Sequence, residues 1–288
     1  MDLAIIVAID FVYAVATLAL ISLGLAIVFG MMRIINLAHG EFMVMGSYSA
    51  SVAVHHHVNI WIAILVVPPI AVGIIGAIIE RLIVRRLYGR MVETMLATWG
   101  LSLFVVGILT TIFGDITEGV PTPLSGITIG AYQTSGYSLF VIALSVATMG
   151  AVYVILRSSR LGLLARGTMQ NADMAAALGT DTSRIYAVTF AFGAALAGFA
   201  GGVLAPVSGV FPTLGGSYIG RAFITVIGGG AAPLVGTASA ATLFGIINQV
   251  ATFLANPVYG EVALLLAAIV LIRALPQGIT GRFLRGSL

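Results

Sequence analysis

Residues 157–184 read RSSRLGLLARGTMQNADMAAALGTDTSR, and they form the longest strongly polar interruption in the second half of the chain. Apolar segments flank this stretch on both sides, and each is near the length of about 20 residues that a helix needs to cross a bilayer. Asn171 or Asp173 can cap a two-turn helix over the alanine run, and Gly179 is suited to end that helix in the left-handed conformation. The stretch therefore predicts a short helix–turn–helix on a membrane surface.

The same stretch carries a small apolar face. Asp181 or Thr182 can cap the segment that follows, so the short helix is expected to end near Gly179. Met174 and Leu178 are four residues apart and share one side of this helix. An exposed apolar pair on an ordered loop indicates a docking surface, and the alternative is that the loop packs only on its own domain.

The composition places the chain in a membrane. Of its 288 residues, 60% are hydrophobic and 8% are charged, and the mean hydropathy is +1.13. Soluble domains contain about 25% charged and about 45–50% apolar residues, so the composition predicts an all-α, polytopic membrane protein.

The residue types that are missing exclude several kinds of chemistry. The chain has no cysteine, and therefore no disulfide, thiol nucleophile or cysteine-ligated metal. All 13 basic residues are arginine, which excludes a P-loop lysine and Schiff-base chemistry. If nucleotide energy drives this protein, another chain must bind the nucleotide. The arginines lie mainly in loops beside apolar segments, which indicates membrane orientation and not nucleic-acid binding.

Apolar segments that could cross a bilayer recur along the whole chain. They are residues 5–29, 41–57, 60–79, 94–113, 138–156, 185–206, 219–233, 234–254 and 261–275. The 41–57 segment begins in polar surroundings, and the 219–233 segment is short and runs through three glycines. We therefore expect about eight or nine crossings in a single transmembrane domain over residues 1–288, with the side of the N-terminus left open.

Charge divides the loops into two sets. Arginines gather between residues 80 and 93, in the 157–184 stretch and in the C-terminal tail after residue 272. The 114–137 loop contains Asp115 and Glu118 but no arginine. The positive-inside rule places the arginine-rich loops in the cytoplasm and the 114–137 loop outside. The prolines and glycines of that outer loop favour a small hairpin or a surface for an external partner.

A polar cluster separates the first two apolar segments. It contains Arg33, Asn36, His39 and Glu41. At membrane depth these groups would have to pair or line an aqueous path, with Arg33 and Glu41 as the candidate pair. The alternative is an interfacial turn in which Arg33 reaches the headgroups and Glu41 begins a helix.

A solute path is expected near this cluster and at a glycine-marked break in the later half of the chain. The predicted lining consists of Asn36, His39, Glu41, Gly228, Gly229 and Gly230. Broken helices near the midplane are typical of transporters. We expect small and mildly polar side chains along this path and no tight, charged binding site.

Close helix packing is predicted by small residues at helical spacing. Ala194, Gly198 and Gly202 are four residues apart, as are Gly73 and Ala77. Small residues at this spacing let two helices in a membrane approach closely.

Catalytic and metal-binding patterns are not found. His55, His56 and His57 are consecutive, and neighbouring helical positions point about 100° apart, so these side chains do not converge on one ion. The HGEF sequence at residues 39–42 lacks the second histidine of H-E-x-x-H, and no G-x-S-x-G occurs. The carboxylates are too scattered for an obvious acid–base pair, which disfavours an intramembrane enzyme.

A free-standing carrier or channel is the alternative transport class. Such a protein would need intramembrane charges for ion coupling. Asp10, Glu41 and Glu261 are the candidates, and each lies near the end of an apolar segment.

Several motifs resemble the LivH-type permeases of bacterial ABC importers for branched-chain amino acids and related solutes. They are INLAHGEFMVMGSY at 35–48, ERLIVRRLYGR at 80–90, GLLARGTMQNADMAAALGTDTSRIYAVTFAFGAALAGFAGGVL at 162–204, AFITVIGGGAAPLVGTASAATLFG at 222–245 and LPQGI at 275–279. The resemblance covers nearly the whole chain. It implies the pseudo-symmetric permease fold of these importers in a bacterial inner membrane.

The resemblance also implies a set of partners. These are a second, LivM-like permease, two cytoplasmic ATPase subunits that bind ATP and magnesium, and an extracytoplasmic solute-binding protein. This chain itself would bind no cofactor. The 157–184 loop corresponds to coupling helices that seat in the ATPase, and its expected contact residues are Arg160, Arg166, Asp173, Met174, Ala177, Leu178 and Gly179.

The solute follows less directly from the resemblance. The general branched-chain amino acid label covers more members of the family than the urea and amide branch does. ETMLATWGLSL at 93–103 and GTMQNADMAAALG at 167–179 are similar to the branch that imports urea and short-chain amides. Both solute classes stay open from the sequence, as does a homodimeric or heterodimeric permease pair.

Overall fold

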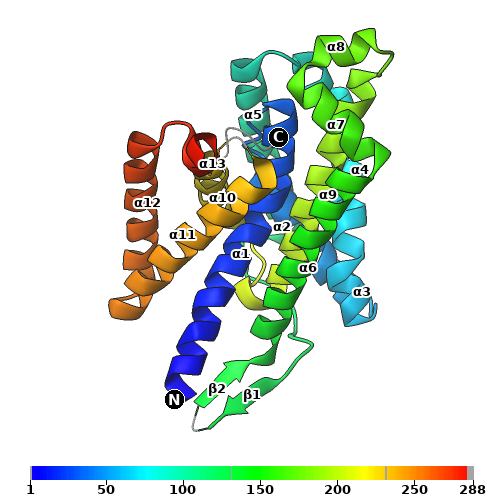
Figure 1. The fold of residues 1–288 in the computed structure, drawn as a ribbon. Coiled ribbons are helices and arrows are strands. Elements are labelled where there is room, and N and C mark those ends of the chain that lie inside the picture. The colour runs from blue at the N-terminus through cyan, green and yellow to red at the C-terminus, as the bar shows by residue number, and fades with distance from the viewer. Residues whose placement is uncertain (1, 131, 231, 284–288) are drawn as a thin grey trace. The chain divides into compact units, whose positions relative to one another are not determined.

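The structure is a computed structural model that describes residues 2–130, 132–230 and 232–283 (Figure 1). Helices account for almost all of its regular structure, and a single two-stranded sheet was found among the described residues. The elements are α1 (Asp2–Met32), α2 (His39–His55), α3 (Ile60–Leu65), α4 (Val67–Leu82), η1 (Val84–Leu87), α5 (Met91–Phe113), β1 (Gly126–Ile129), β2 (Tyr132–Ser135), α6 (Gly136–Ser158), α7 (Arg160–Gln170), α8 (Ala172–Ala177), α9 (Thr182–Ser208), η2 (Pro212–Leu214), α10 (Gly215–Gly229), α11 (Pro233–Leu254), α12 (Pro257–Ala274) and α13 (Gly278–Phe283).

The all-α, polytopic class predicted from composition is confirmed. Seven helical stretches in the described part of the chain are long and apolar enough to cross a membrane. They begin at residues 2, 60, 91, 136, 182, 233 and 257. The other two expected segments form α2 and α10, which have 17 and 15 residues and are shorter than the other candidates.

Contacts divide the chain into two compact units. The first unit contains Met1–Ser22, Thr122–Gly150 and Arg221–Leu288, and the second contains Leu23–Pro121 and Ala151–Gly220. Both units are built from segments that lie far apart in the sequence.

Helix α9 is the centre of the second unit, where it packs against α2 and α4. Gly198 and Gly202 lie on its contact face, so the predicted close approach of small residues is confirmed. A Cβ atom on Gly198 would lie only 2.6 Å from the Cβ atom of Val72 on α4. The hydroxyl of Ser47 on α2 donates to the carbonyl of Gly201 on α9 at 2.9 Å.

The first unit is built around α11, which packs against α12 and α13. Gly245 of α11 lies against the backbone of Val15 on α1, because a Cβ atom at Gly245 would be 2.8 Å from the Cα atom of Val15. The hydroxyl of Ser145 on α6 donates to the carbonyl of Ala16 at 2.7 Å. The strands β1 and β2 form an antiparallel hairpin, which was one of the two alternatives for the 114–137 loop.

Within the second unit, the charged loops lie at opposite ends of α9. Near the first residues of α9, the guanidinium Nε of Arg85 donates to the hydroxyl of Ser183 at 3.1 Å. Beyond the last residues of α9, Glu118 and Val210 form a two-way backbone bridge, with N–O distances of 2.8 and 2.9 Å. An α-helix of 27 residues is about 40 Å long, so α9 is long enough to hold these loops on opposite faces of a membrane. This separation agrees with the positive-inside assignment.

Candidate functional site

Two short helices, α7 and α8, form a hairpin between the ends of α6 and α9 (Figure 1). The predicted caps form: the side-chain oxygen of Asn171 accepts from the backbone N–H of Met174 at 2.9 Å. Asp181 in the same way accepts from the N–H of Arg184 at 3.0 Å and begins α9. Gly179 ends the hairpin with a φ of 86°, the left-handed conformation that glycine adopts most easily. Local residue chemistry therefore determines the shape of this α7–α8 hairpin.

The apolar pair on α8 is exposed. Met174 is 58% exposed and Leu178 is 80% exposed. Asp173, Ala177 and Gly179 beside them are also exposed. No residue of α8 is buried against the rest of the described chain. The hairpin therefore presents an apolar tip with flanking polar residues, and packing among the described residues does not cover this tip.

The base of the hairpin is fixed to the rest of the second unit. Ala165 and Thr168 of α7 are buried, and α7 packs on α9. The guanidinium of Arg166 donates to the carbonyl of Leu156 at the end of α6. Arg160 is exposed, whereas Arg166 is half-buried. The base of the hairpin is thus anchored to both α6 and α9.

The arginine-rich loop after α4 contacts the same end of α9. Tyr88 donates a hydrogen bond to the buried carboxylate of Glu80. Its ring packs edge-on against Tyr186 of α9, with centroids 5.0 Å apart and an interplanar angle of 68°. Burial, followed by the bond to Glu80, raises the pKa of the Tyr88 phenol well above its ordinary value. The arginine-rich loop is therefore joined to the first turns of α9.

The polar cluster between α1 and α2 forms a turn. The side-chain oxygen of Asn36 accepts from the N–H of Ala38 at 3.1 Å, as in a typical Asx turn. Thr98 on α5 holds this turn, because its hydroxyl accepts from the N–H of Leu37 at 3.1 Å. His39 is buried beside Gly24, where its Cε1 atom would lie 3.1 Å from an added Cβ. That Asn36 and His39 line a solute path stays a prediction.

Arg33 and Glu41 do not form the ion pair that was one interpretation of this cluster. Arg33 is exposed and has a φ of 53°. Glu41 is 3% exposed, in the first turn of α2, and its Oε1 atom would lie 2.9 Å from a Cβ atom on Gly215. Arg33 follows α1 in a left-handed backbone conformation and Glu41 lies in the first turn of α2, as the turn interpretation expects. That Arg33 reaches the headgroups stays a prediction.

The glycine break at residues 228–230 lies where α10 ends. Gly228 packs on the ring of Phe244, with 2.8 Å between the ring and an added Cβ atom. Gly229 lies against the backbone of Gly236 at the start of α11. Gly230 has a φ of 84° and packs on Gly278. The chain therefore breaks here as predicted, and these glycines make close backbone contacts within the first unit.

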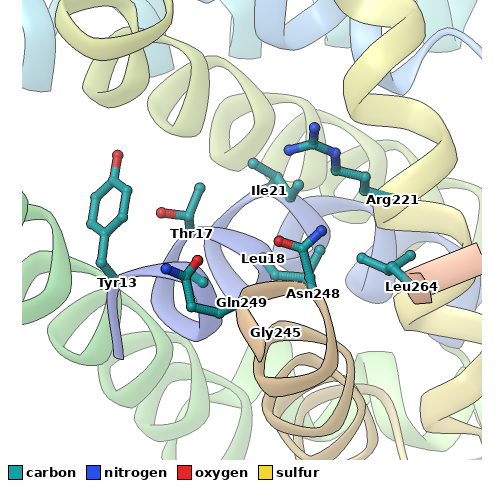
Figure 2. Close-up of a pocket in the computed structure, with 10 residues that line it drawn as sticks. Tyr13, Thr17, Leu18, Ile21, Arg221, Gly245, Asn248, Gln249 and Leu264 are labelled. Carbon is teal, nitrogen blue, oxygen red and sulfur yellow. The ribbon is translucent and has the colours of Figure 1, made fainter. Parts of the chain in front are cut away.

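A cavity of about 200 Å³ opens inside the first unit, between α1, α10, α11 and α12 (Figure 2). Figure 2 shows the guanidinium of Arg221 and the amides of Asn248 and Gln249 directed toward the same space. The full lining is Tyr13, Ala14, Thr17, Leu18, Ile21, Arg221, Gly245, Asn248, Gln249 and Leu264. None of the six residues expected to line a path belongs to this set.

An ion pair fixes the charged member of this lining. The Nε atom of Arg221 donates to Oε2 of Glu261 at 3.1 Å, and the two side chains are each 39% exposed. In the described part of the chain this is the one ion pair. The sequence gives a signal for it: Arg221 and Asn248 are polar residues inside otherwise apolar segments, which are functional candidates in a membrane helix. Glu261 is a candidate from the sequence, whereas Arg221, Asn248 and Gln249 are recognised only once the structure brings them to this cavity.

Comparison with known proteins gives consistent matches along the chain. The family described as "Branched-chain amino acid transport system / permease component" matches residues 7–275. The high-affinity branched-chain amino acid transport system permease protein LivH of Salmonella typhimurium is 28% identical, over 93% of this chain and 92% of its own length. The corresponding BraD protein of Pseudomonas aeruginosa is 27% identical, with the same coverage. A probable branched-chain amino acid transport permease protein LivH of Methanocaldococcus jannaschii is 25% identical, over 92% of this chain and 88% of its own length.

Proposed function

The chain belongs to the branched-chain amino acid transport permease family, and we propose that it is the membrane subunit through which an ATP-driven importer moves aliphatic amino acids across a bacterial inner membrane. The observation that carries this proposal is the family match over residues 7–275 together with seven candidate spans. The chain lacks lysine, and with it the P-loop lysine that holds nucleotide phosphates. Partner chains therefore bind and hydrolyse the ATP.

The α7–α8 hairpin is the contact through which ATP hydrolysis drives this subunit. Its exposed apolar tip, Met174 and Leu178, has the character of an interface core, and polar residues border it. Asp173, Ala177 and Gly179 complete the contact, and the exposed Arg160 provides a positive charge near it. Arg166 supports the hairpin from within, because its guanidinium is bound to the end of α6.

Closure of the ATPase subunits then moves the hairpin as a body. Since α7 packs on α9 and Arg166 bonds to α6, the movement shifts two long helices at once. Shear and hinge movements of packed helices are ordinary ways of switching a transport protein between states. The complete importer consists of this chain, a second permease, two ATPase subunits and an extracytoplasmic solute-binding protein.

The function is tested by deleting the gene in its own host and measuring uptake of labelled leucine and labelled urea. We expect leucine uptake to be lost, to return with the wild-type gene, and to stop when cellular ATP is depleted. Loss of urea uptake alone would show that the importer carries urea or short-chain amides instead of aliphatic amino acids. Unchanged uptake of both solutes would contradict the proposal.

The partner set is tested by purification in mild detergent. Co-elution with ATPase subunits supports the importer. A self-sufficient homo-oligomer that transports solute in liposomes without ATP would instead identify a free-standing carrier.

A further inference from the structure

The cavity of the first unit is lined by both polar and apolar side chains, and this combination suggests what binds there. We propose that it is a solute subsite for an aliphatic amino acid in its zwitterionic form, an inference that rests on the proposed transport function. Arg221, Asn248 and Gln249 contribute polar groups to the lining. Leu18, Ile21 and Leu264 contribute apolar surface. Binding sites of this kind occur between the helices of bundles and combine a mainly apolar wall with a few polar groups.

Arg221 is suited to bind the carboxylate of the solute. A guanidinium offers five N–H donors in a fixed fork that matches a carboxylate. Glu261 holds this fork through the Nε atom at 3.1 Å and also bonds to a terminal nitrogen. Each side chain is 39% exposed, so the pair is not sealed inside the protein. Glu261 is absent from the cavity lining and acts as a positioning residue that fixes Arg221.

The ammonium group of the solute needs acceptors close to that carboxylate site. Asn248 carries a side-chain carbonyl oxygen that can accept a hydrogen bond. Tyr13 and Thr17 of α1 add two hydroxyl oxygens one helical turn apart. Gln249 also lines the cavity and is given no contact with the solute. A cationic donor and several neutral acceptors in one small space are what a zwitterion requires.

The size and position of the cavity agree with a small solute in transit. Its volume of about 200 Å³ corresponds to about seven waters at the roughly 30 Å³ that each occupies in the liquid. Tyr13, Thr17 and Ile21 lie near the middle of the 31-residue helix α1, and therefore near the middle of a membrane-spanning helix. Transporters commonly bind their solutes at this depth.

Urea fits the same space less well. It has no carboxylate for Arg221 and no aliphatic part for the wall formed by Leu18, Ile21 and Leu264. The cavity therefore favours the branched-chain solute over the urea and amide solutes that the sequence left open.

The chain has no cysteine, so a single introduced cysteine can report on the cavity. The experiment uses Gln249→Cys in the complete importer, reconstituted in liposomes without the solute-binding protein and treated with a small thiol reagent. We expect saturating leucine to slow the labelling of this chain at least about fivefold, and urea at equal concentration to leave the rate unchanged. The matched control is Gln133→Cys, which places the same change on the exposed strand β2. Its labelling rate should not depend on leucine.

Two further variants distinguish binding of the solute by Arg221 from positioning of Arg221 by Glu261. Glu261→Gln should weaken protection by leucine, because Arg221 is no longer held, while Arg221→Gln should abolish protection. A merely structural ion pair would leave leucine protection at Gln249→Cys the same in both variants, which would overturn the proposal.

Other outcomes also overturn it. They are protection by urea instead of leucine, equal protection at Gln133→Cys, and failure of Gln249→Cys to react in the solute-free complex. ATP-dependent leucine uptake by the wild-type importer is measured in parallel. Uptake without protection at Gln249→Cys contradicts the subsite and leaves the importer intact, whereas absence of leucine uptake contradicts the proposed function itself.

Discussion

Arg221 on α10 and Glu261 on α12 form an ion pair, in which Nε donates to Oε2 at 3.1 Å across 40 positions of sequence. The pair connects the helix that begins after η2 with the last long apolar helix. It places a positive charge at the wall of a small cavity inside the first unit. Opposite charges on two apolar helices stabilise each other only while both are present.

Replacing one member of this pair should therefore lower the stability of the fold more than replacing both. We expect Arg221→Gln and Glu261→Gln each to lower the unfolding temperature in detergent, and the double variant to recover part of the loss. Since both side chains are partly exposed, the coupling energy should be no more than about 1 kcal/mol. A double-mutant cycle of thermal unfolding measures it, and strictly additive losses would show that the pair contributes nothing to stability.

The exposed tip of the α7–α8 hairpin should transmit the ATPase signal. Leu178→Asp places a charge in an apolar contact, and we expect solute-stimulated ATP hydrolysis by the assembled importer to fall at least about tenfold, equivalent to roughly 1.4 kcal/mol of coupling. Ile116→Asp is a matched control, since it makes the same change at an exposed apolar residue near the other end of α9. Membrane insertion of both variants should equal wild type. Normal solute stimulation of ATP hydrolysis in Leu178→Asp would show that the hairpin takes no part in the coupling.

The contact of α4 with α9 should tolerate no added methyl group at Gly198. A Cβ atom there would lie 2.6 Å from Val72 Cβ and 2.7 Å from the carbonyl oxygen of Pro68. We expect Gly198→Ala to destabilise the protein by about 1–3 kcal/mol through overpacking, measured as a lower unfolding temperature. Gly107→Ala on α5 has no atom within 4 Å of the added group and should be neutral or stabilising. Equal behaviour of the two variants would show that the helices can move apart at no cost.

The Tyr88–Glu80 hydrogen bond should make stability depend on alkaline pH. A phenol whose pKa is higher in the folded than in the unfolded protein stabilises the fold below the unfolded value of 10.0, and this contribution is lost as the pH rises above it. The unfolding temperature of wild type should therefore fall more between about pH 9 and pH 11 than that of Tyr88→Phe.

At neutral pH, Tyr88→Phe leaves a buried carboxylate without its donor, which should cost about 1–3 kcal/mol. Adding Glu80→Gln to this variant removes the buried charge and should restore part of the stability. Parallel pH curves for wild type and Tyr88→Phe would contradict the role assigned to this bond.

Features that depend on neighbouring residues could be predicted from the sequence. Asn171 and Asp181 cap their helices, and Gly179 ends the hairpin, because each acts on backbone groups within three residues of itself. The β1–β2 hairpin and the close packing at Gly198 follow from equally local signals. Membrane-spanning helices follow from runs of apolar residues, which need no knowledge of the partner helix.

Features that depend on which helices meet could not be predicted in this way. Arg33 and Glu41 are close in sequence, yet Arg33 is exposed while Glu41 is buried against Gly215. Arg221 meets Glu261 only because α10 and α12 approach each other in the first unit. Tyr13, Asn248 and Arg221 are brought to one cavity by three different helices. The residue pattern of a single sequence does not indicate which distant helices contact each other.

Helix α9 runs without a break from the α7–α8 hairpin to the Glu118–Val210 bridge, and its single proline, Pro206, comes only in the last turn. Helix α9 packs against α2 and α4, so we expect it to move as one rigid helix when one of its ends is displaced. Under the proposed importer function, a displacement of the hairpin would therefore reach the far end of α9 within one continuous helix. The events that ATP hydrolysis and solute delivery cause at the two ends would then need no separate element to connect them.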